Sequence, residues 1–458
     1  MEKITLVKTY KYRAILSKTE EAKFDNWIRL TRQVHNLCTE QRRMFEKMGK
    51  REFWNPDVDK LSKGNHLHYL RKTTTYNQQS KEVTILRREF PFLAEVPFRL
   101  MDDSVKVVDD AFQDFNKNKK SFYSNFKKGK KVDFPEPPSF SSRWDDFSLK
   151  FMVSTIDFRI EKTGDTNARV FGFPKHKTGI KIKYHTPAIG EIRGLILKKE
   201  KDEWYLCVVV RTVVQNTFNA QNPDNRPKVG VDLGVKKTIA LSTDYTLSLP
   251  RERIKDLQER KKVLQRRLRN KKKGSKNLRK AYDRIAKIDK KVARIRSYML
   301  KMYATEIARD YSFIGVEDLA VKNMTASAKG TIENPGVNIK AKSGLNREVL
   351  GIAPYMFKEF LKQKSKEYFS KVVEVAPHYT SQMCFECKHV DPGNRETQGG
   401  FKCLKCGHED NADYNAAKNI LFKAINSEPE YALKVAKKAE SVVKRNNFKR
   451  KPKNKEVA

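Results

Sequence analysis

Two closely spaced pairs of cysteines constrain the fold of this chain more than any other feature of its sequence. The pairs are Cys384 with Cys387 and Cys403 with Cys406, each a CxxC, and fifteen residues separate them. This spacing is typical of a zinc ribbon, in which two thiolates from each of two knuckles complete a tetrahedron around Zn²⁺. Because four thiolates leave no open position on the ion, we expect the site to be structural rather than catalytic.

Other cysteines and histidines are weaker candidates for this metal site. His389 and His408 each follow a knuckle and could replace a cysteine, although four thiolates suffice. Cys38 and Cys207 have no cysteine near them in the sequence. We expect these two thiols to be small, buried apolar groups.

The charge of the chain predicts a polyanionic partner. Among 458 residues, 96 are Lys or Arg and 55 are Asp or Glu, which gives a formal net charge of +41. Self-repulsion of this size is usually relieved by nucleic acid or by an anionic membrane. The sequence has no apolar run approaching about 18 residues and no signal peptide. We therefore expect nucleic acid, no membrane partner, and a cytoplasmic, prokaryotic location at the nucleoid when DNA is bound.

The first 225 residues alternate between strand and helix patterns. A strand is expected over residues 4–16, followed by a helix that Ser17 or Thr19 would cap. Two further helices are expected near 75–90 and 98–127, and short β-like runs fill 147–215. These runs could close one small barrel with the N-terminal strand, so that the helices form an insertion. The expected apolar helix faces contain Phe24, Trp27, Ile28, Val34 and Leu37 in the first helix, and Leu100, Val107, Val108, Ala111 and Phe115 in the third.

Residue 226 opens a second region, in which buried strands carry or end in acidic residues. Strand patterns occur at "KVGVDLG", "TIALST", "YSFIGVEDL" and "KVVEVAP". A long basic helical stretch over 251–310 is broken near "NKKKGSKN", and another helix is expected near 353–370. The segment 322–347 is rich in Gly, Lys and Asn and is expected to be mobile, and the basic tail from residue 445 is expected to be disordered.

Three carboxylates accompany these patterns. Asp232 lies inside a predicted strand, Glu317 at the end of another, and Asp413 just before a helical "NAAKNI". A buried aspartate is costly unless it is paired or binds a metal ion. Asp232 is therefore either the structural partner of a Lys or Arg, or a metal ligand. Gly230 and Gly234 favour the second interpretation, because they would let a substrate backbone approach closely.

The chemistry of the three carboxylates predicts the ion and the substrate. Carboxylates without a partnered His or Ser nucleophile suit Mg²⁺ or Mn²⁺, which prefer oxygen ligands. Two such ions about 4 Å apart can activate a water and stabilise the leaving oxygen of a phosphodiester. In a basic protein the obvious phosphodiester is nucleic acid. Phosphoryl transfer from a nucleotide is the alternative, but the sequence has no GxxxxGK[ST] loop.

Several motifs together resemble one known family. They are "VGVDLGVKKTIALS", "FIGVEDLAVKNM", "VVEVAPHYTSQMCFECKH", "CLKCGHEDNADYNAAKNI" and "KGSKNLRKAYDRIAKI". With them the chain resembles the TnpB family of transposon-encoded, RNA-guided nucleases and their relatives, the compact type V CRISPR effectors. The resemblance is specific from about residue 226 to 425 and looser before that. Where many transposon members have a DRD triplet, this chain has Asn411-Ala412-Asp413, a form similar to that of the CRISPR branch.

The resemblance implies an α/β multidomain fold. Its parts would be an RNase H-like (RuvC) nuclease core with a zinc-ribbon insertion, and an N-terminal β-barrel wedge domain carrying a helical recognition lobe. The implied boundaries are 1–16 and 131–225 for the wedge, 17–130 for the recognition lobe, 226–380 and 411–425 for the nuclease with a basic helical insertion 251–310 and a candidate lid 322–347, 381–410 for the zinc ribbon, and 426–458 for a basic C-terminal tail.

The resemblance also implies roles for single residues. Asp232, Glu317 and Asp413 match the family's catalytic carboxylates and would hold Mg²⁺ (or Mn²⁺) in a two-metal site, while the four paired cysteines match its structural Zn²⁺ ligands. The protein would bind a guide RNA, recognise a short flanking motif and cut both strands of double-stranded DNA at one site. Candidate nucleic-acid contacts are Tyr76, Asn77, Gln78, Lys81, Arg266, Arg267, Lys276 and Arg279. For Thr73–Lys81, a capped helix start facing solvent is the alternative interpretation.

Three other functions stay open at this point. A nuclease-dead relative would be a guided DNA-binding regulator, but all three carboxylates are present. A guide-independent RNase H-like nuclease or transposase, of the resolvase or integrase type, would cleave without RNA and leaves residues 1–225 unexplained. A structural zinc-ribbon protein would tolerate the loss of all three carboxylates. A monomer and a homodimer are equally compatible with the sequence, as are a transposon end and a CRISPR array as the source of the guide.

Overall fold

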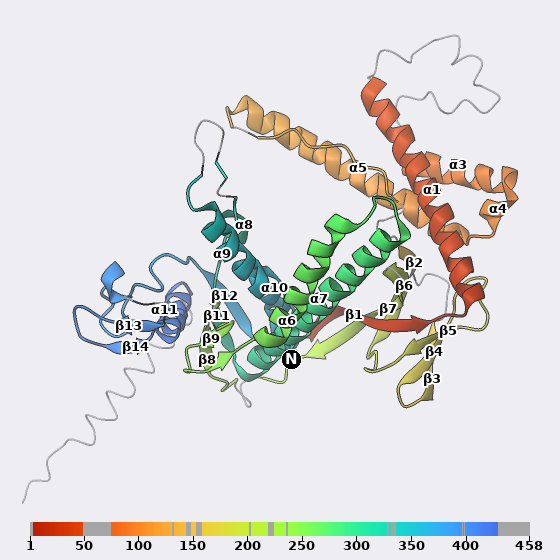
Figure 1. The fold of residues 1–458 in the computed structure, drawn as a ribbon. Helices are drawn as coiled ribbons and strands as arrows, with labels where there is room; N and C mark the ends of the chain where they lie inside the picture. Colours follow the sequence, from red (N-terminus) through yellow and green to blue (C-terminus); the bar gives the residue numbers. More distant parts are fainter. Residues whose placement is uncertain are drawn as a thin grey trace, which may run out of the picture. The chain divides into compact units, whose positions relative to one another are not determined.

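The chain forms two compact units, each described here by itself (Figure 1). The N-terminal unit is Thr5–Val214, and the C-terminal unit is Gln215–Ala458 together with Met1–Ile4. The computed structural model describes residues 3–48, 75–130, 132–142, 148–152, 158–200, 203–218, 224–234, 237–327, 329–330, 336–395, 397 and 399–428. Thr73, Thr74 and most of the predicted basic tail lie outside these residues.

The N-terminal unit contains a seven-stranded sheet in the order β2-β6-β7-β1-β5-β4-β3. Its strands are β1 (Lys3–Ile15), β2 (Ser148–Met152), β3 (Arg159–Gly164), β4 (Asn167–Phe171), β5 (Ile180–Lys183), β6 (Glu191–Glu200) and β7 (Glu203–Gln215). In β5 the two isoleucines are buried and the two lysines exposed, because successive side chains of a strand point to opposite faces. The predicted N-terminal strand is confirmed. Closure into a barrel, which would require β2 to meet β3, stays a prediction.

Between β1 and β2, the described residues form four helices. They are α1 (Lys18–Met48), α3 (Tyr76–Glu89), α4 (Pro91–Ala94) and α5 (Phe98–Lys127). At the start of α1 the Ser17 amide donates to the Glu20 carboxylate at 2.7 Å, and the Glu20 amide donates back to the Ser17 hydroxyl at 3.3 Å. This reciprocal pair is a capping box, so Ser17 rather than Thr19 begins the helix.

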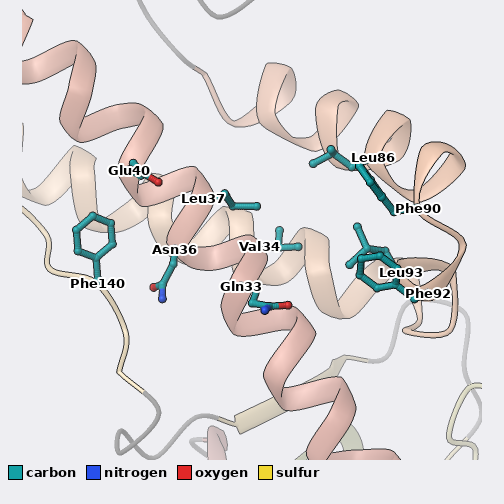
Figure 2. A pocket seen from close by; sticks show the side chains of 10 residues that line it. All are labelled: Gln33, Val34, Asn36, Leu37, Glu40, Leu86, Phe90, Phe92, Leu93 and Phe140. Atoms are coloured by element: carbon teal, nitrogen blue, oxygen red, sulfur yellow. The ribbon is translucent and has the colours of Figure 1, made fainter.

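An apolar hollow of about 470 Å³ lies beside α1 in the N-terminal unit. Figure 2 shows Val34 and Leu37 of α1 pointing toward it, with Phe90, Phe92 and Leu93 on its other side. Leu37, predicted on the apolar face of this helix, is 54% exposed. It lines the hollow, whereas Val34 also reaches the core. Val107, predicted on the apolar face of α5, is likewise exposed.

The C-terminal unit contains a five-stranded sheet in the order β10-β9-β8-β11-β12. Its strands are β8 (Lys228–Asp232), β9 (Ile239–Leu241), β10 (Thr246–Leu247), β11 (Phe313–Glu317) and β12 (Lys371–Val375). β11 runs parallel to both β8 and β12, while β9 is antiparallel to β8. β8 and β11 are almost wholly buried, as expected for strands covered on both faces.

Helices cover both faces of this sheet (Figure 1). The helices of the unit are α6 (Arg251–Arg267), α7 (Lys276–Asp310), α8 (Val321–Met324), α9 (Ile339–Ile352), α10 (Pro354–Tyr368) and α11 (Ala412–Asn426). Val229, Val231, Ile314 and Val316 share one core with residues of α6, α7 and α10. The alternate residue Phe313 shares a second core with Ile420 and Ala424 of α11, on the other face.

The predicted break in the long basic helix is confirmed. A 3₁₀ turn (Leu268–Asn270) ends α6, Gly274 has a φ of +77°, and Ser275 caps α7 by accepting a hydrogen bond from the Leu278 amide at 3.1 Å. The last residues of 322–347 belong to α9, a helix that was not predicted, and the mobility expected for this segment stays a prediction. That helix is anchored by the buried side chains of Val349 and Ile352, which lie beyond the predicted segment. No helix in the described part of the chain is long and apolar enough to cross a membrane.

Candidate active site and metal centre

The three predicted carboxylates come from the ends of three neighbouring elements. Asp232 is the last residue of β8 and Glu317 the last of β11. Val231 and Val316 are partners in the parallel ladder, so the acids that follow them lie at the same edge of the sheet. Such carboxyl-terminal edges of parallel strands commonly form sites. α11 packs on β8 and β11 and brings Asp413 to them.

Asp413 lies inside the first turn of α11, not before the helix as predicted. Asn411 caps this helix, because its side-chain oxygen accepts a hydrogen bond from the Asp413 amide at 3.1 Å. The helix begins at Ala412, three residues earlier than "NAAKNI" suggests. An acidic residue in the first turn is stabilised by the positive end of the helix dipole.

The two glycines beside Asp232 have different roles. A Cβ on Gly234 would lie 2.9 Å from the carbonyl oxygen of Lys237, so Gly234 lets the loop after β8 fold closely on itself, beside Asp413. A Cβ on Gly230 would lie 1.9 Å from the carbonyl oxygen of Ala417, inside α11. Gly230 therefore permits a helix, rather than a substrate, to approach the strand, and its predicted role is corrected.

Asp232 is held in an environment that disfavours its charge. Burial, followed by the negative charges of Glu317 and Asp413, raises the pKa of Asp232 to about 7, although Arg395 partly opposes this. Among the described residues, no lysine or arginine nitrogen lies within 4.0 Å of the Asp232 carboxylate, as a structural ion pair would require. The arrangement therefore favours a bound cation over the ion-pair interpretation.

Two further side chains contact the other acids. The Thr380 hydroxyl donates to Oε1 of Glu317 at 2.5 Å, and a guanidinium nitrogen of Arg395 lies 3.7 Å from Oδ1 of Asp413. Burial raises the pKa of Glu317, while Thr380 and the charge of Lys423 lower it. The sequence analysis missed both Thr380 and Arg395. Their position beside the cysteine motif, in "PHYTSQMC" and "PGNRE", was the available signal.

The carboxylates fit a hard divalent cation. Their oxygens are the ligands that Mg²⁺ and Mn²⁺ prefer, and their mutual repulsion is relieved by positive charge. The four paired cysteines, called the cysteine quartet below, are a separate group of ligands. Their sulfur atoms all lie within 4.8 Å of one another. The carboxylates offer oxygen and the quartet offers sulfur, so the two groups suit different ions.

The four paired cysteines converge as predicted. Cys384 Sγ lies 3.7 Å from Cys406 Sγ, and Cys387 Sγ lies 3.5 Å from Cys403 Sγ. Thiolates around a tetrahedral Zn²⁺ lie roughly 3.8 Å apart, since each Zn–S bond is about 2.3 Å. The quartet can thus hold zinc. His389 and His408 are not part of it, and Cys38 and Cys207 are buried, as predicted.

Two matching backbone turns form the knuckles. The Cys384 amide donates to the His389 carbonyl, and the Cys403 amide to the His408 carbonyl, both at 2.9 Å. The second knuckle joins β13 (Gly400–Lys402) to β14 (Glu409–Asn411), an antiparallel pair, and a 3₁₀ turn (Pro392–Asn394) lies between the knuckles. Burial raises the pKa of Cys384 to about 12, whereas for Cys403 burial is outweighed by the amides of Cys406 and Lys405 and by the neighbouring thiols, which lower the pKa of that thiol to about 6. A low pKa favours the thiolate, the form that binds metal.

The predicted nucleic-acid contacts fall into two groups, one in each unit. Of the first group, Gln78 completes a capping box with Thr75, and the Tyr76 hydroxyl donates to Asp102 at 2.9 Å. These two polar groups serve the fold, which supports the capped-helix interpretation for them, while Asn77 and Lys81 are exposed. The second group is exposed at the end of α6 and the start of α7 and comprises Arg266, Arg267, Lys276 and Arg279.

Comparison with known proteins identifies the family. Residues 206–328 match the family described as "Probable transposase" (OrfB_IS605), and residues 355–420 match the Cas12f1-like TNB domain. The chain is 30% identical to "Putative RNA-guided DNA endonuclease InsQ" of Escherichia coli (strain K12) over 333 residues, 73% of this chain and 76% of that protein. The chain belongs to the TnpB and compact type V CRISPR effector family.

A further curated protein matches a shorter part of the chain at higher identity, and a solved structure matches most of the chain at lower identity. "CRISPR-associated endodeoxyribonuclease Cas12f1" of Sulfoacidibacillus thermotolerans is 52% identical over 63 residues, 14% of this chain and 15% of that protein. A solved structure described as "Cryo-EM structure of the Cas12f1-sgRNA-target DNA complex" is 16% identical, with 91% of this chain and 98% of that chain covered and a TM-score of 0.46.

Proposed function

We propose that this chain is an RNA-guided DNA endonuclease. It binds a guide RNA, recognises a short motif beside the target and cleaves both strands of double-stranded DNA at one site, formed by Asp232, Glu317 and Asp413. The observation that carries the proposal is the convergence of β8, β11 and α11, which raises the pKa of Asp232 to about 7. The relatives named as RNA-guided endonuclease and CRISPR-associated endodeoxyribonuclease support the same activity.

The fold supports matching domain roles. A five-stranded sheet with three parallel strands and an antiparallel β9 beside β8 supports an RNase H-like, RuvC-type core for 226–380 and 411–425. The cysteine quartet lies in the proposed zinc ribbon, 381–410. In the N-terminal unit we assign the sheet strands of 1–16 and 131–225 to the wedge and the helices of 17–130 to the recognition lobe.

The proposed cofactors follow from the donor atoms. Asp232, Glu317 and Asp413 would hold Mg²⁺ or Mn²⁺, and the cysteine quartet would hold Zn²⁺. When bound, the divalent ions supply the Lewis acidity that activates a water and stabilises the leaving oxygen of the phosphodiester. Thr380 and Arg395 each contact one carboxylate and limit its movement. The arginine also adds positive charge where a phosphate would lie.

Charge and base pairing have different roles in the recognition of nucleic acid. The net charge of +41 suits two polyanions, the guide RNA and the target DNA. Base pairing with the guide reads the target sequence, and the protein reads the flanking motif. The exposed residues Arg266, Arg267, Lys276 and Arg279 are the proposed backbone contacts, and Asn77 and Lys81 are the polar candidates in the helical region.

Purification with the native flanking locus tests the guide. We expect a discrete RNA to co-purify with the chain and to direct cleavage of a matching duplex in the presence of Mg²⁺. Cleavage by RNA-free protein would instead identify a guide-independent nuclease or transposase. Guided binding by the wild type without any cleavage would identify a DNA-binding regulator.

Substitution of Asp232 tests the site. Asp232→Ala removes one of three charges that hold the cations, so we expect guided cleavage to fall by at least about 1000-fold while target binding persists. Asp289→Ala is the matched control, because Asp289 is an exposed acid on α7 that pairs with Lys261. Cleavage rates and filter-binding affinities should be measured on the same preparations. Retained cleavage in the Asp232 variant would show that the site is assigned wrongly.

A further inference from the structure

A short buried strap connects the active site to the zinc ribbon. We use this name for residues 380–385, which run from Thr380 to the first knuckle. Thr380 is 3% exposed, Met383 8% and Cys384 0%. Its first residue contacts the Glu317 carboxylate, and its fifth residue is one of the paired cysteines. The strap is thus a short covalent path between the two sites.

Two asparagines of α11 fix the strap in place. The Asn419 side-chain amide donates to the carbonyls of Thr380 at 3.0 Å and Met383 at 2.6 Å. One turn earlier, Asn415 donates to the Met383 carbonyl at 2.8 Å and accepts from the Phe385 amide at 2.9 Å. Both asparagines are 0% exposed. Because buried amides and carbonyls are costly without partners, these bonds hold the strap firmly against α11.

The Thr380 hydroxyl then fixes one oxygen of Glu317. It lies 2.5 Å from Oε1 of Glu317 and 3.0 Å from the carbonyl oxygen of Pro377. A hydroxyl has one proton, and an ionised carboxylate is the stronger acceptor. The hydrogen bond therefore goes to Glu317 and restricts rotation of its carboxylate. Without this donor, the buried carboxylate would be free to turn.

We propose that Thr380 is a positioning residue that orients the Glu317 carboxylate toward the divalent cation, and that Asn415 and Asn419 hold Thr380 in place through the strap. The same helix that presents Asp413 thereby also sets the direction of Glu317. This proposal rests on the proposed function, because it takes Glu317 as a cation ligand. It adds three side chains that touch neither substrate nor ion.

The test compares Thr380→Val with Thr380→Ser. Valine keeps the shape of threonine but removes the hydroxyl, whereas serine keeps the hydroxyl. Thr39→Val is the matched control: Thr39 is 1% exposed, lies in the N-terminal unit and donates to the His35 carbonyl at 2.8 Å. Zinc content and the melting temperature should be measured first. If the valine variant loses zinc or melts non-cooperatively, the same measurements should be made on Thr380→Ala instead.

The decisive readout is Mn²⁺ affinity, measured by titration calorimetry on the full chain with its co-purified RNA. Thr380→Val removes a hydrogen bond to a charged group, so we expect its Kd for Mn²⁺ to rise about tenfold or more. Serine should restore the affinity to within about threefold, and Thr39→Val should leave it unchanged. Unaltered Mn²⁺ affinity in Thr380→Val, with zinc retained, would overturn the proposal.

Cleavage gives a second readout that separates this proposal from the proposed function. We expect Thr380→Val to need about tenfold more Mg²⁺ for half-maximal guided cleavage, with the maximal rate largely recovered at high Mg²⁺. A rate that Mg²⁺ does not recover, in both valine and serine variants, would indicate a merely structural role and contradict the proposal. If the wild type itself does not cleave, the proposed function fails, while the Mn²⁺ titration still decides whether Thr380 positions Glu317.

Discussion

Asp232 lies where three negative charges meet at the edge of a buried sheet. Its carboxylate faces the charges of Glu317 and Asp413 as well as the cost of burial, and its pKa is about 7 as a result. Near neutral pH and without a cation, this residue therefore keeps its proton in a large fraction of molecules. A divalent cation reverses the balance, because it makes the ionised form the stable one. Protonation of Asp232 and cation binding thus compete.

Stability without divalent cations should therefore depend on pH through Asp232. An unfolded Asp loses its proton near pH 4, and the folded one near pH 7, so the folded state binds more protons between these values. The free energy of unfolding should fall as pH rises through this window, by roughly 4 kcal/mol at most. Urea denaturation in zinc-replete, magnesium-free buffer measures this free energy at each pH, and Asp232→Asn is the reference protein. Parallel curves for the two proteins would contradict the assignment.

Single residues differed in how well the sequence predicted them. The acids of β8 and β11 stand out because an acid interrupts or ends an apolar run, and the cysteines because their spacing is typical of a metal site. Thr380 has only its place beside the cysteine motif as a signal, since its role depends on Glu317, 63 positions away in the chain. Gly230 was noticed for the wrong reason, because a sequence does not show which helix packs on a glycine.

At the scale of elements, α11 depends on two glycines in the sheet beneath it. Cβ atoms on Gly230 and Gly315 would lie 1.9 Å from the Ala417 carbonyl and 2.8 Å from the Ala424 side chain. The close approach brings Asp413 to the edge that carries Asp232 and Glu317. A larger residue at either position would therefore displace the helix and one of its acids together.

We expect Gly230→Ala to destabilise the C-terminal unit by about 3 kcal/mol and to abolish guided cleavage, because α11 must move away from β8. Gly344→Ala is the matched control: Gly344 lies in α9, and a Cβ there would meet nothing within 4 Å. The control should be neutral or more stable by roughly 0.5–1 kcal/mol, since alanine favours helix. Thermal and chemical denaturation measure the stability of both variants. A Gly230→Ala protein as stable and active as wild type would refute this packing.

Helices and strands with a clear periodicity of apolar residues were predicted well. Their end residues and their exposed faces were predicted less well. The strand at the N-terminus, the broken helix before Asp310 and the strand "KVVEVAP" all have patterns that local sequence determines. α9 was missed because its composition resembles a loop, and its two buried anchors stand near its end. Leu37 lies on the predicted apolar face and is still exposed, because helical periodicity gives a face but not whether that face meets the core or the apolar hollow.

At the scale of the whole molecule, positive charge dominates. A net charge of +41 is spread over a chain that we propose to hold two nucleic acids. Each phosphate contact releases counterions, so affinity falls steeply as salt rises. The charge predicted the class of partner, but not which basic residues touch it, because solvent-facing and phosphate-facing lysines have the same sequence pattern.

The basic residues at the α6–α7 break can be tested through this salt dependence. Arg266→Ala combined with Arg267→Ala should reduce the slope of log affinity against log salt by about one for each phosphate that the variant no longer neutralises. Arg309→Ala is the control, because it removes a positive charge near the far end of α7, where Arg309 pairs with Asp310. This variant should leave the slope unchanged. Binding of guide RNA and of target duplex should be titrated separately. Equal slopes for both variants would exclude a phosphate contact at the break.

The wide spacing of the three acids along the chain has a consequence for protein synthesis. At about 5–20 residues per second, a ribosome needs roughly ten to forty seconds to add the roughly 180 residues from Asp232 to Asp413. The N-terminal unit has its own core and is complete before that interval begins. A nascent chain can therefore fold its first unit while it still lacks the acid that completes the proposed nuclease, so translation order itself delays DNA cutting until Asp413 has been added.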